Sequence, residues 1–312
     1  MLSAMRPRRT LFAPLALLAV CGGAWAQSPQ VFQFFASAAD ATGAPVTDLR
    51  PQDVVVLENL ARQQVAKVEP VSVPVKLTIA IDNSGDSAEA LAHYRSGLTG
   101  LVEALPPDVE VTLITTAPQP RFVLRASTDR VRILRAINGF ATEPGRPRFT
   151  DALVEFGRRL QQEAKDPRVG PYVPVLLMVS TTAVEQTSYE SREIDNAVNF
   201  MVNRRARLIV AIMSTRTGQA ALPETVDASL QGIVAIPIVK ATNGRYEALS
   251  ASSRIATLLP ELGREVAALH ARHANQFRVT VERSAAGPPQ NVRIQVAREG
   301  VKGVFTYDGY LP

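Results

Sequence analysis

The sequence predicts an α/β fold: a doubly wound, mostly parallel sheet, joined to a small antiparallel β-sandwich that the two ends of the chain form together. Two patterns lead to this prediction. Through the middle of the chain, short apolar and β-branched runs alternate with helical segments, as expected of a parallel sheet covered on both faces. At both ends, apolar and polar residues alternate without any helical pattern, which is typical of antiparallel strands.

The first β segment covers residues 27–73 and the second covers residues 274–312. Strand-like runs lie at 31–35, 54–57, 277–282 and 292–297, and a Gly-Ala-Pro turn lies at 43–45. Neither segment has enough strands to be stable alone. We therefore expect the two segments to pair with each other, which brings the ends of the chain together beside the α/β domain.

The segment between them, residues 74–273, is expected to form the α/β domain. Strands are expected at 76–81, 109–115, 173–179 and 208–213, with a shorter one at 233–238, and helices at 87–105, 129–137, 151–164, 192–202 and 253–272. In the first helix Tyr94, Leu98 and Leu101 recur at helical spacing and should face the sheet. Pro106 then ends this helix.

The beginning of the chain has the pattern of a signal peptide covering residues 1–26. Basic residues precede an apolar run at 11–20 and a small-x-small site that ends at Ala26. The protein is therefore expected outside the cytoplasm, either periplasmic or secreted. No later stretch reaches the roughly 20 apolar residues of a spanning helix, so no membrane span is expected. An Arg-Arg pair at 8–9 leaves a twin-arginine route open, and Cys21 leaves a lipoprotein anchor open.

The charge distribution argues against a nucleic-acid-binding protein, and the cysteine content argues against a disulfide-stabilised one. The net charge of +5 falls to +2 without the three arginines of the predicted signal peptide, and the remaining basic residues are scattered. Nucleic-acid binding needs a basic stripe to neutralise phosphates, so it is not expected. Because Cys21 is the single cysteine and lies in the signal peptide, the mature chain has no disulfide and depends on a buried core.

A candidate site follows the strand predicted at 76–81. Asp82, Ser84 and Asp86 alternate along the loop that leads into the next helix. Ligands of open α/β sheets collect at the carboxyl ends of strands. Three oxygen-bearing side chains aimed at one point suit hard cations such as Mg²⁺ or Ca²⁺. The same residue types also form turns and cap helices, so both interpretations stay open.

The loop resembles a known metal site. Asp82-x-Ser84-x-Asp86 is similar to the Asp-x-Ser-x-Ser motif of the metal-ion-dependent adhesion site in von Willebrand factor type A (vWA) domains, although the family has a hydroxyl where Asp86 stands. The resemblance implies Thr150, just before a helix, as a further ligand. It also expects an aspartate after the fourth core strand, where this chain has Thr181.

Further short motifs extend the resemblance over nearly the whole mature chain. A Gly-x-Pro-Val turn begins at Gly43, an Asp-Val-Val-Val-Leu-Glu run begins at Asp53, and Asp-Gly-Tyr begins at Asp308. In this order they look like a bacterial secreted family related to vWA domains. The resemblance therefore implies a Rossmann-like fold and a binding or adhesion-type role.

Two functions follow from the resemblance. In the first, Mg²⁺, Mn²⁺ or Ca²⁺ is held by Asp82, Ser84, Asp86 and Thr150, and a carboxylate of a protein partner completes its coordination. In the second, Thr181 in place of the acidic ligand leaves the degenerate site without metal, and the protein is an interaction scaffold without a cofactor.

No catalytic residue is expected. Ser84 lacks the Gly-x-Ser-x-Gly elbow of a nucleophile, and no glycine-rich phosphate loop follows a strand. His270 and His273 are spaced three apart near a helix end, but the Glu of a zinc-binding helix motif is missing. These histidines are therefore expected on a solvated helix face, and the chain is expected not to be an enzyme.

Overall fold

The computed structural model describes residues 30–215, 226–283 and 287–310. The predicted signal peptide, with its cleavage site and Cys21, lies outside the described residues. None of the described helices has the length and apolar character needed to cross a membrane.

The larger part of the fold is a six-stranded sheet with the order β6-β5-β4-β7-β8-β9. Its strands are β4 (Val75–Ile81), β5 (Glu110–Thr115), β6 (Arg121–Ser127), β7 (Val173–Thr181), β8 (Arg207–Met213) and β9 (Arg245–Leu249). All neighbours are parallel except β6, which runs antiparallel to β5 at the edge. Every residue of β7 is buried, as expected of a central strand covered on both faces. The predicted α/β class with a mostly parallel sheet is confirmed.

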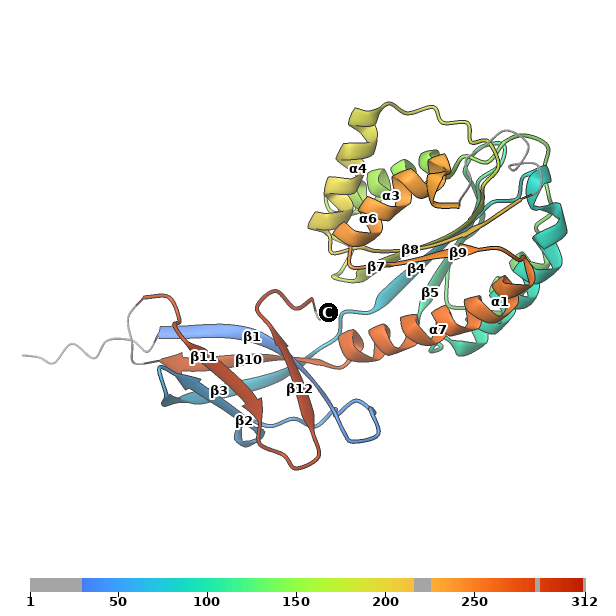
Figure 1. Ribbon diagram of the computed structural model, residues 1–312. Coiled ribbons are helices and arrows are strands. Elements are labelled where there is room, and N and C mark those ends of the chain that lie inside the picture. Colours follow the sequence, from blue (N-terminus) through green and yellow to red (C-terminus); the bar gives the residue numbers. More distant parts are fainter. Residues whose placement is uncertain (1–29, 216–225, 284–286, 311–312) are drawn as a thin grey trace, which may run out of the picture.

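Helices cover both faces of this sheet (Figure 1). On one face lie α1 (Leu91–Ala104), α2 (Arg130–Gly139) and α7 (Ser253–Ala274), and on the other lie α3 (Phe149–Glu163), α4 (Ser191–Asn203) and α6 (Leu230–Ala241). Three short 3₁₀ helices are η1 (Pro51–Asp53), η2 (Gly85–Ala90) and η3 (Val226–Ala228). Tyr94, Leu98 and Leu101 are fully buried, so the predicted sheet-facing side of α1 is confirmed.

The helices α1 and α7 cross at two glycines. A Cβ atom on Gly97 would lie 2.7 Å from the carbonyl oxygen of Ile255, and one on Gly263 would lie 2.7 Å from the carbonyl oxygen of Leu101. The backbones therefore approach more closely at this crossing than any larger residue would allow.

The strand predicted at 233–238 is wrong, because these residues lie within α6. The buried residues of α6 include Gln231, Ala235, Ile238 and Val239, which recur at helical spacing. Ser229 begins the helix by accepting a hydrogen bond from the backbone N–H of Gly232 at 3.1 Å. The strand of this region comes later, as β9.

The two chain ends form a second six-stranded sheet with the order β11-β2-β3-β10-β1-β12. Its strands are β1 (Gln30–Ala39), β2 (Val54–Glu58), β3 (Ala61–Val71), β10 (Gln276–Arg283), β11 (Val292–Val296) and β12 (Lys302–Thr306). All the pairings are antiparallel, and β1 from one end lies between β10 and β12 from the other. Its core includes Phe34, Val56 and Val279, each at most 1 % exposed.

The outer strands of this second sheet approach each other across the core (Figure 1). A Cβ atom on Gly303 of β12 would lie 2.8 Å from Cγ2 of Val296 of β11. The sheet therefore curls around its core as one hydrogen-bonded set of strands, and the division into the two sheets of a sandwich stays a prediction. Arg283 and Glu58 form an ion pair within it, and both side chains are 3 % exposed.

The expectation of a solvated face for His270 and His273 is wrong. Their exposed fractions are 4 % and 1 %. His270 accepts a hydrogen bond from the backbone N–H of Val75 at 3.3 Å and lies 3.1 Å from the carboxylate of Asp108. Both imidazoles pack where α7 meets the beginning of β4 and β10, so they join the two parts of the fold.

Candidate cation site at the carboxyl end of the parallel sheet

Asp82 lies directly after β4 and is completely buried. One carboxylate oxygen accepts the backbone N–H of Ser84 at 2.9 Å, and the other accepts the hydroxyl of Thr181 at 2.5 Å. Thr181 is the last residue of β7, which is paired in parallel with β4. The sheet register therefore brings together two residues that are 99 positions apart.

Ser84 and Thr150 carry buried hydroxyls that make no hydrogen bond of normal geometry among the described residues. Each hydroxyl still lies near a carboxylate whose pKa it lowers, Ser84 near Asp82 and Thr150 near Glu185. The two residues are 0 % and 1 % exposed. Ser84 precedes η2 without a side-chain cap bond, and Thr150 lies inside α3, after its N-cap Arg148. The capping alternative therefore does not explain either hydroxyl, and a buried unpaired hydroxyl costs about 1–3 kcal/mol.

Glu185, four residues after Thr181, is a site residue that the sequence analysis missed. Its Oε1 accepts the backbone N–H of Thr150 at 2.5 Å, and its Oε2 is buried without a partner among the described residues. Burial raises the pKa of Glu185 to about 7, the hydrogen bonds of Thr150 oppose this rise, and the charges of Asp151 and Asp82 add to it. An acidic side chain in the loop after β7 was the available signal, because that loop meets the same edge of the sheet.

The ionised form of Asp82 is also disfavoured by burial. Burial raises its pKa above the ordinary value, the charge of Asp86 adds to the rise, and the bonds from Thr181 and Ser84 oppose it. Asp86 itself is only partly buried in the first turn of η2. The buried Asp82 and the partly buried Glu185, whose pKa the charge of Asp82 raises, are the kind of environment that a cation stabilises.

The donor atoms fit a hard cation. Asp82, Ser84, Thr150 and Glu185 offer only oxygen, as Mg²⁺ and Ca²⁺ prefer. Within the described ranges no group of three His, Cys, Asp or Glu side chains could hold a metal, so any cation here depends on the hydroxyls.

The edge of the sheet is closed in this conformation. Asp82, Ser84, Thr150 and Thr181 are each at most 1 % exposed. The segment 183–190 lies over the start of α3, where the carboxylate of Asp151 accepts hydrogen bonds from the Thr187 hydroxyl at 2.9 Å and the Ser188 N–H at 2.8 Å. A cation at these four residues would therefore have no position that faces solvent, although the expected partner carboxylate needs one.

Asn83 fixes the loop that carries the site. Its side-chain oxygen accepts the N–H of Ala117 and its side-chain amide donates to the carbonyl of Ala141, both at 3.0 Å. Its own carbonyl accepts the N–H of Glu143 at 2.8 Å. Three loops are thereby held together, so the positions of Asp82 and Ser84 are defined by the surrounding backbone.

No protein-family model matches the chain, and no curated protein matches it either. Among solved structures, the chain is similar to a von Willebrand factor type A protein from Catenulispora acidiphila, with 11% identity, a TM-score of 0.49, and coverage of 89% of this chain and 73% of that one. It is also similar to the hypothetical protein BatB from Bacteroides thetaiotaomicron (15% identity, TM-score 0.42, coverage 62% and 98%). A third is the VWA domain of SpRpn10 (12% identity, TM-score 0.42, coverage 60% and 95%). At these identities the likeness concerns the fold alone, and two of the three structures are von Willebrand factor type A domains by name.

Proposed function

We propose that this chain is an exported protein-binding module that recognises its partner through a divalent cation at the carboxyl end of the parallel sheet. Asp82, Ser84 and Thr150 hold the cation, and Glu185 supplies the second carboxylate. The observation that carries the proposal is the pair of buried hydroxyls of Ser84 and Thr150, which make no hydrogen bond of normal geometry and lie close to two carboxylates of raised pKa. Export rests on the predicted signal peptide at residues 1–26.

Each residue has a defined part in this proposal. A cation at the site supplies a coordination position for a carboxylate oxygen of the partner. Thr181 orients the Asp82 carboxylate through its 2.5 Å hydrogen bond, in place of the aspartate that vWA domains have there. Glu185 provides the missing negative charge from the same loop. Because the site is closed, the segment 183–190 has to move before a partner can reach it.

The test is calorimetric titration of the protein with Mg²⁺, Mn²⁺ and Ca²⁺. We expect binding heat from the wild type and from the control Asp195→Ala, which removes an exposed carboxylate on α4. Asp82→Ala should abolish the heat, and Glu185→Gln should weaken binding while keeping a side chain that accepts the Thr150 N–H. Circular dichroism checks that the variants are folded. If no cation gives heat with the folded wild type, the cation half of the proposal is wrong.

A metal-free scaffold is the second candidate function. It is favoured by the neutral Thr181 and by the closed edge, where a hydrogen-bonded Asp82 is 0 % exposed. Thermal melting with and without EDTA separates the two candidates, because a cation that binds only the folded state raises the melting temperature. An unchanged midpoint in excess Mg²⁺ and in EDTA favours the scaffold.

A further inference from the structure

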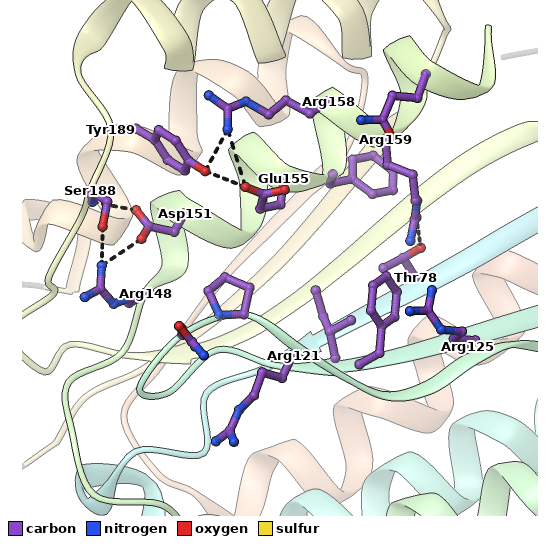
Figure 2. Close-up of a pocket in the computed structure, with 16 residues that line it drawn as sticks. Thr78, Arg121, Arg125, Arg148, Asp151, Glu155, Arg158, Arg159, Ser188 and Tyr189 are labelled. Atoms are coloured by element: carbon purple, nitrogen blue, oxygen red, sulfur yellow. Dashed lines mark hydrogen bonds and ion pairs between the residues drawn. The ribbon is translucent and has the colours of Figure 1, made fainter. Parts of the chain in front are cut away.

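A cavity of about 720 Å³ lies between α3 and the edge strand β6, next to the segment 183–190, which contributes Ser188 and Tyr189 to its lining (Figure 2). Thr78, Ile114 and Phe122 line it from three neighbouring strands, and Phe156 lines it from α3. Pockets of roughly 300–1,000 Å³ are the usual size for specific ligands. The apolar part of the lining can pack against a ligand, while the rest is strongly charged.

The charge of this cavity is unbalanced. Five arginines line it, but only two carboxylates do, Asp151 and Glu155. Three of the arginines are paired with carboxylates. The pairs are Arg148 with Asp151, Arg158 with Glu155, and Arg121 with Glu143 outside the lining.

Of the other two arginines, Arg125 is exposed and has no ion pair within the described part of the chain, and Arg159 has only a long one with Glu163. Arg125 stacks on the ring of Phe122 at 4.6 Å and has no ion pair or hydrogen bond with the described part of the chain. Arg159 donates to the hydroxyl of Thr78 at 2.5 Å, and its buried Nε lies 3.7 Å from the carboxylate of Glu163 without a hydrogen bond. In Figure 2 both guanidinium groups lie beside Thr78.

The environment of Arg159 makes an anionic ligand favourable. Burial lowers the pKa of Arg159, since desolvation disfavours its charge, and the charge of Glu163 only partly opposes this effect. A guanidinium presents a planar set of donors that matches a carboxylate in a bidentate pair. A carboxylate between Arg125 and Arg159 would therefore pair with one arginine that has no ion pair and with one whose charge Glu163 compensates only weakly.

The backbone next to the cavity favours an extended ligand. In the sheet order β6 is an edge strand, paired only with β5 among the described strands. A free strand edge offers N–H and C=O groups to an added strand, and alternate side chains of that strand then point to the same side.

We propose that this cavity is the docking site for an acidic, extended peptide segment of a partner protein. Glutamate or aspartate side chains of the segment pair with Arg125 and Arg159, and apolar side chains between them pack on Phe122 and Phe156. The proposal does not depend on a cation, because no residue of the candidate cation site lines the cavity.

The experiment is a fluorescence-anisotropy titration of the full chain with a short labelled peptide of alternating glutamate and threonine. A peptide with glutamine in place of glutamate is the control ligand. We expect the acidic peptide to bind, the glutamine peptide not to bind, and the affinity to fall with increasing salt. Arg125→Gln should weaken binding about tenfold, since a charge-assisted hydrogen bond is lost. Arg125→Lys should weaken it less.

The control variant is Arg264→Gln, which removes an exposed arginine of α7 on the opposite side of the sheet and should leave binding unchanged. Equal binding of the two peptides, or of wild type and Arg125→Gln, would overturn the proposal. Displacement of the peptide by inorganic phosphate or by single-stranded DNA at lower concentration would also overturn it, because the site would then take another anion. Asp82→Ala should bind the peptide normally, so failure here is distinguishable from failure of the cation site.

Discussion

Replacing Glu185 by glutamine should stabilise the protein at alkaline pH and leave it nearly unchanged at acidic pH. In the folded protein the pKa of Glu185 is about 7, against an ordinary value of 4.5, chiefly because the side chain is buried. The folded state therefore binds the proton more tightly than the unfolded state. Stability is fully retained below pH 4.5 and decreases as the pH rises through 7, where the buried side chain ionises.

The size of the effect follows from the two pKa values. Each pH unit between them corresponds to about 1.4 kcal/mol, so ionisation of Glu185 destabilises the fold by roughly 3.5 kcal/mol at most. Glutamine keeps an oxygen that can accept the N–H of Thr150 but has no charge. We therefore expect Glu185→Gln to exceed the wild type in the free energy of unfolding by about 1–3 kcal/mol at pH 8.

Urea denaturation at pH 5 and pH 8 in EDTA measures this difference. Asp82 titrates in both proteins, so the comparison removes its own ionisation and keeps only its repulsion of the Glu185 charge. Glu299→Gln, on an exposed loop, should show the pH dependence of the wild type. If Glu185→Gln loses as much stability between pH 5 and pH 8 as the wild type does, the assignment of Glu185 to a buried position beside Asp82 is refuted.

Three further predictions concern packing, charge and pairing. Gly97→Ala should lower the unfolding free energy by about 1–3 kcal/mol because the added Cβ has no room against α7. Gly139→Ala, where nothing lies within 4 Å of the added Cβ, should not lower it, and denaturant midpoints measure both variants. Thr181→Asp should lower stability in EDTA and strengthen Mg²⁺ binding in calorimetry, because it adds a carboxylate to a buried site. Arg283→Met should cost about 3–5 kcal/mol because Glu58 stays buried and unpaired, and adding Glu58→Leu should recover most of the loss in a double-mutant cycle.

The parallel sheet could be predicted because its central strands have a distinctive composition. The runs in β4, β7 and β8 are apolar and β-branched since both faces of these strands are buried. The edge strand β6 was missed for the same physical reason: most of its residues are exposed, so nothing in its composition requires an apolar run. Helix α6 was mistaken for a strand because a short run rich in isoleucine and valine fits either structure. Pro237 within that run argued against a central strand.

The residues of the candidate site that lie at strand ends could be predicted from the sequence, and the residue that a loop contributes could not. Asp82 and Ser84 follow β4 and Thr181 ends β7, so the sheet register fixes how they meet. Glu185 reaches the site through a loop, and its contact with Thr150 joins residues 35 positions apart without any repeating pattern. Sequence spacing could not reveal that contact, nor that the loop closes the site to water.

The position of β1 between β10 and β12 has a consequence for biosynthesis. Gln30 is paired with Arg283 and Phe35 with Thr306, so both neighbours of the first strand emerge from the ribosome last. The parallel sheet, with all its strands between Val75 and Leu249, can assemble while β1 still has neither neighbour. Contacts of such long sequence separation form slowly. A chain interrupted before residue 276 would carry a folded α/β domain and a bare, half-apolar first strand, which is a surface that chaperones and proteases can recognise as an unfinished product.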